Sequence, residues 1–522
     1  MFGGLAGQMA DTFQVVDLFA GPGGLAEGFS SFTDAQDHRP FDIAFSVERE
    51  ASAHRTLLLR SFLRQFDGDL PASYYEWLNT GGRQPDWSID FPGQWKGAKA
   101  EALLLELGDP AANEIVHQKA REIRASKARS IVIGGPPCQA YSLVGRARNA
   151  GIATYEAAED KRHFLYQEYI DILAHLQPDA FVMENVKGML SSSVGEGRIF
   201  GQILADLRSV NGVQDSYQLF AIARSPSGSM MLQRADAPAD YVVKAERYGV
   251  PQARHRVIII GIRSDLVAGD TERRTSGESA PVEATVRHVL DGFPRLRSGL
   301  SKDDDPSVWR EAAARQIARV CAALDSEAHR PVMASVLDAA RKHQAVFARL
   351  ANKLGRESRD GAPLSDDCPA DLAAFLTDPL LTATLNHSAR GHMNDDLGRY
   401  FFVSVFGEVT GETPKSHEFP AALAPAHINW NTGKFADRFR VQRWDRHATT
   451  VTSHISKDGH YFIHPDPAQC RSLTVREAAR LQTFPDNYVF LGNRTEQYVQ
   501  VGNAVPPFLA RQIAGAVWTA IR

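Results

Sequence analysis

Five short apolar segments in the first half of the chain limit its fold more than any other feature of the sequence. Each is rich in β-branched or aromatic residues and ends near Gly, Pro or an acid, and helical stretches separate them; they are 13–19, 43–48, 130–134, 180–183 and 257–262. Such alternation is typical of a parallel sheet with crossover helices. The sequence therefore predicts an α/β fold, a doubly wound and mostly parallel sheet built from residues 1–262.

The rest of the chain is patterned differently. An extra stretch at 61–108 is rich in aromatics and glycine, and 263–305 is polar like a linker or loop. Residues 308–354 are Ala-rich with helical spacing, and the chain from about Tyr400 is β-like and aromatic. Residues 474–484 and 506–521 are predicted to be helical. We expect a smaller second domain at 263–465 that includes a helical insertion. The segment 466–522 is expected to return to the first domain.

Composition narrows the class of protein without giving a function. No run of about 18 apolar residues is present, and the N-terminus lacks a basic region followed by an apolar core, so we expect neither a membrane span nor secretion. Four cysteines lie far apart without a CxxC pair, which argues against structural zinc or disulfides and fits a reducing cytoplasm. The net charge of −4 neither supports nor excludes a nucleic-acid partner, because a global sum does not describe one cleft.

The first motif is Asp17-Leu-Phe-Ala-Gly-Pro-Gly-Gly24, between a predicted strand and a helix. Glycines at such a turn let backbone N–H groups and the helix N-terminus approach a ligand closely. Glu48 ends the next predicted strand, where nucleotide-binding α/β folds place an acid that holds ribose hydroxyls. An ordinary tight turn remains the alternative.

The second motif is Gly134-Gly-Pro-Pro-Cys138-Gln-Ala-Tyr-Ser142, again at the end of a predicted strand. Consecutive glycines and prolines stiffen and open this loop, which argues against the usual burial of a cysteine in a core. We therefore interpret Cys138 as a nucleophilic thiolate.

Two further motifs carry charged side chains at predicted strand ends. Glu184, in Met183-Glu-Asn-Val186, is expected to point into the same cleft, although a helix cap or ion pair is the alternative. In Gln252-Ala-Arg254-His-Arg256, alternate side chains share one face of an extended chain, and a solvated basic edge is the alternative.

In this order, these motifs resemble those of the bacterial C5-cytosine-specific DNA methyltransferases. Two C-terminal stretches complete the set, Arg471-Ser-Leu-Thr-Val-Arg-Glu-Ala-Ala-Arg-Leu-Gln-Thr-Phe-Pro485 and Gln500-Val-Gly-Asn-Ala-Val-Pro-Pro507. The resemblance covers about 1–60, 105–262 and 440–522. It implies a Rossmann-like class I fold that uses S-adenosyl-L-methionine, with a smaller target-recognition domain.

The resemblance also implies a cofactor pocket. Phe19 would stack near the adenine, the glycines of the first motif would line the methionine moiety, and Glu48 would hold the ribose. The full set of implied cofactor residues is Phe19, Gly21, Gly23, Gly24, Glu48, Asp109, Pro137, Leu165 and Asn503. Asp109, in Leu-Gly-Asp-Pro, has the shortest local match.

The implied catalytic residues are Cys138, Glu184, Arg254 and Arg256. Cytosine C5 is too poor a nucleophile to attack a methyl sulfonium, so the Cys138 thiolate would first add at C6 and give an enamine. Glu184 would stabilise charge developing on the ring, and the two arginines would position the ring and the catalytic loop. Because a cytosine inside a duplex exposes neither face, the base must be flipped out of double-stranded DNA.

The second domain would hold that DNA. Residues 429–460 place six basic side chains against three acids, interleaved with four aromatics: Lys434, Arg438, Arg440, Arg443, Arg446 and Lys457, with Asp437, Asp445 and Asp458, and with Trp430, Phe435, Phe439 and Trp444. This composition suits phosphate and base contacts, and a packed aromatic core with solvated charges is a compatible alternative. Arg440 and Arg443 are the predicted DNA contacts here, and Gln139 and Ser142 those of the catalytic loop.

Two other functions would leave different features in the sequence. A tRNA cytosine-5 methyltransferase would carry a Cys-Phe-Thr signature and a small recognition lobe, and a catalytically silent DNA-binding relative would have lost Cys138 or the glycines. Neither description fits. We expect a cytoplasmic enzyme at the bacterial nucleoid, a monomer on DNA with no metal, that protects host DNA in a restriction-modification or other anti-phage system rather than setting a housekeeping mark.

Overall fold

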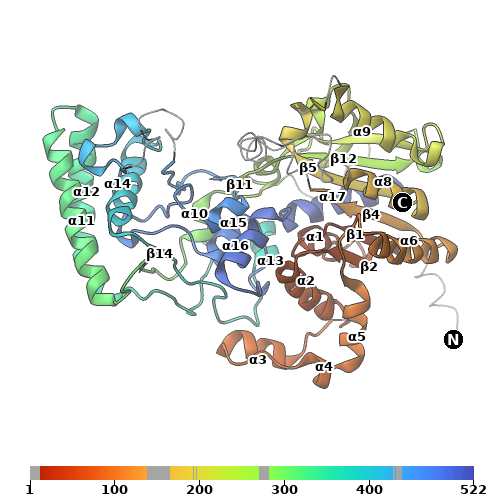
Figure 1. Cartoon of the computed structure of the whole chain (residues 1–522), viewed down its shortest axis with the longest axis horizontal. Coiled ribbons are helices and arrows are strands. Elements are labelled where there is room, and N and C mark those ends of the chain that lie inside the picture. The colour runs from red at the N-terminus through yellow and green to blue at the C-terminus, as the bar shows by residue number, and fades with distance from the viewer. Residues whose placement is uncertain are drawn as a thin grey trace.

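The computed structural model describes residues 12–66, 68–137, 165–191, 193–194, 197–269, 281–426, 430 and 438–522. They form two lobes joined by a layer of short helices and loops (Figure 1).

One sheet lies at the centre of the larger lobe, with the order β3-β2-β1-β4-β5-β12-β8-β9 and with β10 paired to β12. Its strands are β1 (Phe13–Leu18), β2 (Phe41–Glu48), β3 (Ala102–Leu104), β4 (Ser130–Gly134), β5 (Ala180–Val186), β8 (Tyr217–Arg224), β9 (Met230–Arg234), β10 (Val242–Lys244) and β12 (His255–Arg263). From β3 to β5 neighbouring strands are parallel, whereas β12 is antiparallel to both β5 and β8. All five predicted strands are present and the predicted α/β class is confirmed, but β12 runs against the parallel set.

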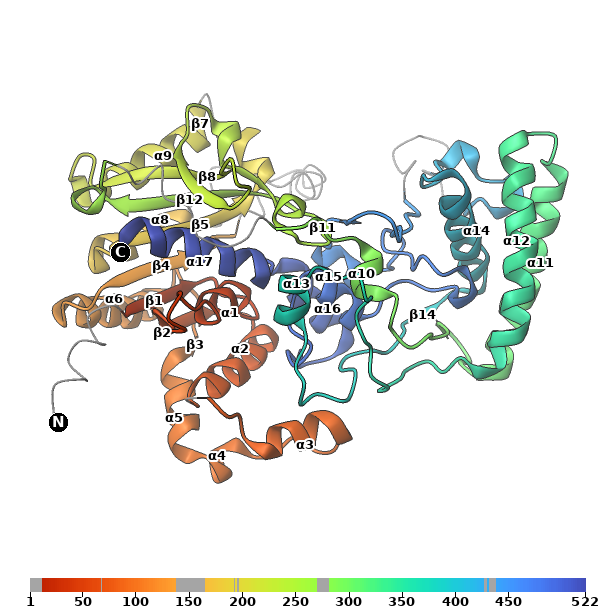
Figure 2. The same ribbon diagram turned by 180° about the vertical axis from the view of Figure 1, so that it is seen from behind.

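Helices cover both faces of this sheet (Figure 2). Along β1, Val15 packs into one apolar cluster and Val16 into another, as expected when successive side chains point to opposite faces. On one face lie α1 (Gly24–Ser30) and α17 (Pro507–Ile521), and on the other α6 (Pro110–Ala125), α8 (Leu165–Leu176) and α9 (Ile199–Arg208). A methyl group on Gly28 would meet Pro507 O and Arg511 N at 2.6 Å, so glycine allows α1 and α17 to approach closely.

The stretch after β2 adds a helical layer with its own aromatic core. It contains α2 (Ala51–Arg64), α3 (Ala72–Thr80), α4 (Trp87–Asp90) and α5 (Pro92–Glu101). Phe62 and Trp87 stack at 5.0 Å within a cluster that also includes Leu385 and Val489. This layer therefore joins the start of the chain to its C-terminal segments.

The smaller lobe is built on α11 (Pro306–Ser326), α12 (Pro331–Leu350) and α14 (Asn394–Thr410). The first two confirm the predicted helical region. The prediction of β-like structure from about Tyr400 is wrong, because residues 394–410 are a helix. Its aromatic and β-branched residues suggested a strand, but α14 is buried from Asp396 to Gly407, and a helix that is apolar all round belongs in a core.

Short elements connect the lobes: α10 (Val286–Leu290), α13 (Ala370–Leu376), α15 (Val475–Leu481), α16 (Arg494–Asn503), β11 (Gln252–Ala253), β13 (Gly299–Leu300), β14 (Gly391–His392) and β15 (Ala448–Thr449); β6 (Ser193–Val194) and β7 (Gly197–Arg198) form a small ribbon. The predicted helices near 474–484 and 506–521 are confirmed as α15 and α17. The region 263–305 contains α10 and β13 within its loops. In the described ranges, no helix has the length and apolar character needed to cross a membrane.

Candidate active site

The carboxyl ends of the parallel strands meet at one edge of the sheet, and the loop after β1 opens there. Gly21 has φ +59° and Gly23, the N-cap of α1, has φ +102°, backbone conformations that L side chains rarely adopt. A methyl group on Gly21 would meet no atom within 4 Å, so this side of the loop faces open space. Phe19 also has positive φ, +57°, and is half-buried against the core. The loop thus places an open backbone surface beside the start of α1, while the N–H groups of Ala20, Gly21 and Gly23 donate to Val47 O, Glu48 Oε2 and Ala20 O.

Glu48 closes this loop from the neighbouring strand. Its Oε2 accepts a hydrogen bond from Gly21 N at 2.7 Å, and its Oε1 accepts one from Glu50 N at 2.6 Å. The residue is 8% exposed, and burial raises the pKa of its carboxyl while the two N–H donors lower it. The predicted acid and the predicted glycine loop are therefore in direct contact.

The other predicted cofactor residues lie around the same edge. Asp109 caps α6, since its Oδ1 accepts from Ala111 N and Ala112 N at 3.0 Å, and its chain neighbour Gly108 would contact Leu165 if it carried a methyl group. Asn503 is exposed at the end of α16, and the two residues after it contact Gly24.

Glu184 and Arg256 form the centre of the polar part of the site. They lie on the adjacent strands β5 and β12, and Arg256 Nε is 2.9 Å from Glu184 Oε1, with each side chain 14% exposed. Burial lowers the pKa of Arg256, and the charge of Glu184 opposes that effect. Next to Glu184, Asn185 Nδ2 donates to Pro136 O at 3.1 Å, which fixes the start of the second motif beside the pair.

Arg254 has different surroundings from Arg256. It is 2% exposed, and its Nη1 donates to Val451 O at 2.8 Å while both terminal nitrogens reach Gly502 O at 3.3 Å. Burial, followed by repulsion from Arg256, holds its pKa well below the usual range. Arg254 thus ties the QARHR motif to the residue that precedes Asn503.

Cys138, Gln139 and Ser142 lie outside the described residues, as do Lys434, Phe435 and Asp437 of the basic and aromatic segment. The described stretch before Cys138 ends at Pro137, which is half-buried. Pro137 directly follows Pro136, the residue whose carbonyl accepts from Asn185.

The described part of the segment 429–460 is mainly packed and paired. Trp430 and Phe439 belong to the core of the small lobe. Arg443 makes a bidentate contact with Asp445, and Arg440 lies 5.9 Å from the ring centre of Tyr461. Trp430 and Phe439 therefore match the alternative of a packed aromatic core.

Asp17 is a feature that the sequence analysis did not single out, although it begins the first motif. It is fully buried, and neither carboxylate oxygen has a hydrogen-bond partner in the described part of the chain. Burial raises its pKa from 3.8 to about 8. The available signal in the sequence was an acidic residue near the end of the mostly apolar strand Phe13–Leu18.

Fold and site together define a class: a Rossmann-like α/β enzyme whose glycine loop and strand-end acid suit a nucleoside cofactor, with a second polar centre on the adjoining strands. Comparison with known proteins then identifies the family. The profile of the family "C-5 cytosine-specific DNA methylase" matches residues 107–304 and 398–518.

Several curated relatives are similar over most of the chain. The type II methyltransferase M.Bpa9945I of Bacillus paralicheniformis is 32% identical, over 96% of this chain and 98% of the relative. The DNA (cytosine-5-)-methyltransferase M.ApeKI of Aeropyrum pernix is 27% identical over 74% and 80%. A crystal structure described as a DNA modification methyltransferase encoded within an E. coli prophage matches with a TM-score of 0.52 at 17% identity, covering 97% of this chain and 99% of that one, which shows the fold.

The chain belongs to the C-5 cytosine-specific DNA methylase family. It is a DNA (cytosine-5-)-methyltransferase, and enzymes of this family and fold use S-adenosylmethionine in general.

Proposed function

We propose that this chain methylates C5 of a cytosine flipped out of a specific double-stranded DNA sequence, through a covalent bond between Cys138 and C6. The observation that carries the proposal is the Glu184–Arg256 ion pair. It lies next to Asn185, which donates to Pro136 O, two residues before Cys138. A carboxylate fixed by a guanidinium in this position can bind the polar edge of a cytosine.

The residues at the other end of the site fit S-adenosylmethionine. Gly21 borders open space, Glu48 presents a carboxylate to ribose hydroxyls, and only Oδ1 of Asp109 is used in capping, which leaves Oδ2 to accept from an amine. Phe19, Gly23, Gly24, Pro137, Leu165 and Asn503 would complete the pocket. When bound, the cofactor supplies an electrophilic methyl group.

The chain's own residues would prepare the cytosine for that group. The Cys138 thiolate forms a bond to C6, and the displaced ring electrons make C5 nucleophilic. Glu184 stabilises the ring at N3 and the exocyclic amine, and Arg256 orients Glu184 and the ring. After methylation at C5, loss of the C5 proton and of the thiolate restores the aromatic ring. From its contacts with Val451 and Gly502, we assign Arg254 a positioning role.

We propose that 1–262 and 466–522 form the catalytic domain and 263–465 the target-recognition domain. The contact of α17 with α1 supports the return of the C-terminal segment. Gln139, Ser142, Arg440 and Arg443 would contact DNA. The type II names of the relatives support a role in restriction-modification. We further propose that the enzyme acts as a monomer, in the cytoplasm at the nucleoid.

Trapping with DNA that carries 5-fluorocytosine tests the proposal. Fluorine does not leave as a proton does, so the wild type should form a covalent complex that survives denaturation. Cys138→Ser should not, because a hydroxyl is far less ionised than a thiol with pKa of about 8.5. Cys321→Ser and Cys368→Ser are the matched controls and should still trap. If Cys138→Ser also traps DNA, another residue is the nucleophile.

A further inference from the structure

Tyr488, in the C-terminal segment, contacts the glycine loop that follows β1. Its hydroxyl donates a hydrogen bond to Pro22 O, between Gly21 and Gly23. A methyl group on Gly23 would lie 3.1 Å from the hydroxyl oxygen, so the loop and the tyrosine are in close contact. Tyr488 is fully buried, and burial raises the pKa of its hydroxyl, which therefore stays protonated and able to donate.

Two other hydrogen bonds hold the loop, and both come from β2. Ala20 N donates to Val47 O at 3.0 Å, and Gly21 N donates to Glu48 Oε2 at 2.7 Å. The bond from Tyr488 lies further along the loop, at the residue between two glycines whose backbones can adopt many conformations. It should therefore restrict a part of the loop that the two strand contacts do not reach.

Arg60 of α2 holds Tyr488 in place. Its guanidinium carbon lies 4.4 Å from the centre of the tyrosine ring, which is a cation–π contact. The same guanidinium pairs with Glu27 of α1 at 2.5 Å and donates to Asn487 Oδ1 at 3.2 Å. Because α1 begins at the glycine loop, one side chain connects that helix with the segment that carries Tyr488.

The helical layer after β2 reaches the same segment through α3. Tyr74 is fully buried, and its hydroxyl donates to Asn487 O at 2.7 Å. Asn487 Nδ2 donates to Asp378 Oδ2 at 2.6 Å, and that oxygen also accepts from the Tyr75 hydroxyl at 2.8 Å. The layer thus holds both the backbone and the side chain of the residue next to Tyr488. The family profile begins its match at residue 107, after this layer.

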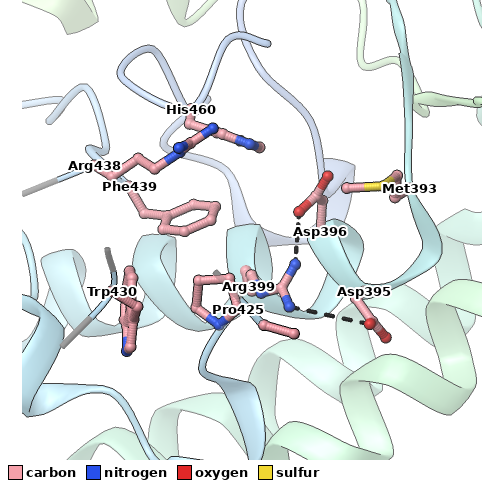
Figure 3. Close-up of a pocket in the computed structure, with 10 residues that line it drawn as sticks. Met393, Asp395, Asp396, Arg399, Pro425, Trp430, Arg438, Phe439 and His460 are labelled. Carbon is pink, nitrogen blue, oxygen red and sulfur yellow. Dashed lines mark hydrogen bonds and ion pairs between the residues drawn. The ribbon is translucent and has the colours of Figure 1, made fainter. Parts of the chain in front are cut away.

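The ion pairs of Arg399 in the small lobe are arranged differently. Arg399 lines a cavity of about 290 Å³, and its pairs with Asp395 and Asp396, at 4.0 and 2.9 Å, stay within α14 (Figure 3). Arg60 and Glu27 instead come from two different helices. A pair within one helix stabilises that helix, whereas a pair between helices fixes how they lie relative to each other.

We propose that Tyr488 is a positioning residue for the cofactor loop, and that the helical layer 51–101 holds it there through Arg60 and Tyr74. The inference rests on the proposed cofactor site, and it gives a role to the aromatic stretch 61–108, which the resemblance does not cover. Tyr488 acts through Pro22 O and takes no part in methyl transfer. Loss of its hydroxyl should therefore weaken S-adenosylmethionine binding without slowing the reaction once the cofactor is saturating.

Calorimetry and kinetics with the full-length protein test the proposal. Tyr488→Phe removes only the hydroxyl and should weaken S-adenosylmethionine binding about three- to tenfold, the loss expected for one hydrogen bond. Its kcat at saturating cofactor, and its DNA affinity measured without cofactor, should match the wild type. Tyr498→Phe is the matched control, because Tyr498 is also fully buried and donates to a backbone carbonyl, Leu473 O, at 2.6 Å. It should lose similar stability in urea but keep wild-type cofactor affinity.

A second variant tests the layer and remains informative if Tyr488→Phe does not fold. Tyr74→Phe removes the bond to Asn487 O and should weaken cofactor binding less than Tyr488→Phe does. If Tyr74 acts through the Tyr488 hydroxyl, adding Tyr74→Phe to Tyr488→Phe should cause no further loss, whereas additive losses would overturn the role of the layer.

The proposal as a whole is overturned if neither Tyr488→Phe nor Tyr74→Phe weakens cofactor binding, or if Tyr498→Phe weakens it as much as Tyr488→Phe. A wild type that binds no S-adenosylmethionine would instead refute the proposed cofactor site. Covalent trapping at Cys138, measured in parallel, reports on the catalytic proposal independently.

Discussion

Replacing Asp17 with asparagine should make the protein more stable, and increasingly so as the pH rises. Asp17 is fully buried beneath the glycine loop, without a hydrogen bond to either oxygen in the described part of the chain. Burial raises its pKa from 3.8 to about 8, although the positive charge of Arg64 opposes that effect. The folded protein thus holds a protonated carboxyl at a pH where the unfolded chain holds an ionised one.

The size and sign of the effect follow from proton linkage. A carboxyl whose pKa is higher in the folded state takes up a proton on folding, so its contribution to stability is complete below pH 3.8 and is lost as the pH rises to about 8. Each pH step of one within that window changes the free energy of unfolding by about 1.4 kcal/mol, or about 5–6 kcal/mol over the whole window. An asparagine does not titrate and removes this slope.

Urea unfolding of the wild type and of Asp17→Asn at about pH 5 and about pH 7 measures this pH dependence of the free energy of unfolding. The stability of Asp17→Asn relative to the wild type should rise by about 3 kcal/mol between these conditions. Asp42→Asn, on the exposed side of the neighbouring strand, should show no such change. If the difference between Asp17→Asn and the wild type is the same at both pH values, Asp17 does not change its protonation on folding and its assigned pKa is wrong.

Three further changes test other parts of the molecule. Glu48→Ala should weaken S-adenosylmethionine binding by about 1.5–3 kcal/mol in calorimetry while DNA binding stays intact, and unchanged cofactor affinity would contradict its role. Arg440→Glu and Arg443→Glu should each weaken DNA binding and lower its salt slope by about one; an unchanged slope would leave them a structural role. Glu27→Gln should lower the free energy of unfolding by about 3–5 kcal/mol, because Arg60, paired with it at 2.5 Å and 10% exposed, would lose its carboxylate; full retention of stability in urea would refute this.

The sequence predicted five strands of the large lobe because their apolar runs are short and end at turn residues, whereas β3, β8, β9 and β10 were not predicted. The same regularity brought the predicted site residues together, since parallel strands deliver their carboxyl ends to one edge, as Glu48 and Gly21 show. The helix α16 was missed, although Asn493 and Glu496 form a capping box at its start and that spacing was present in the sequence.

Tertiary contacts determine the secondary structure of residues 394–410 and the partners of Arg254 and Arg256, which the sequence pattern did not predict. Residues 394–410 contain many strand-forming residues but form a helix, because α11 and α12 provide apolar surfaces on several of its sides. Likewise, the spacing of Arg254 and Arg256 predicted a shared face but not their separate partners. Arg256 reaches the carboxylate of Glu184, and Arg254 reaches the backbone carbonyls of Val451 and Gly502. These partners lie about 70 to 250 residues away along the chain.

Those distant contacts explain why the C-terminal motifs belong to the same site. Gln252 Nε2 donates to Gln482 Oε1 at 2.7 Å, and Gln482 Nε2 donates to Val501 O at 2.7 Å and to Ala504 O at 3.0 Å. Both glutamines are fully buried, so each amide must satisfy its hydrogen bonds within this junction. Asn503 lies between the residues that Gln482 holds, while Arg254 holds the residue before it. Buried hydrogen bonds from Gln252 and Arg254, which directly precede the strand β12 that carries Arg256, therefore hold the residues on either side of Asn503, so the proposed cytosine and cofactor ends of the site share one junction.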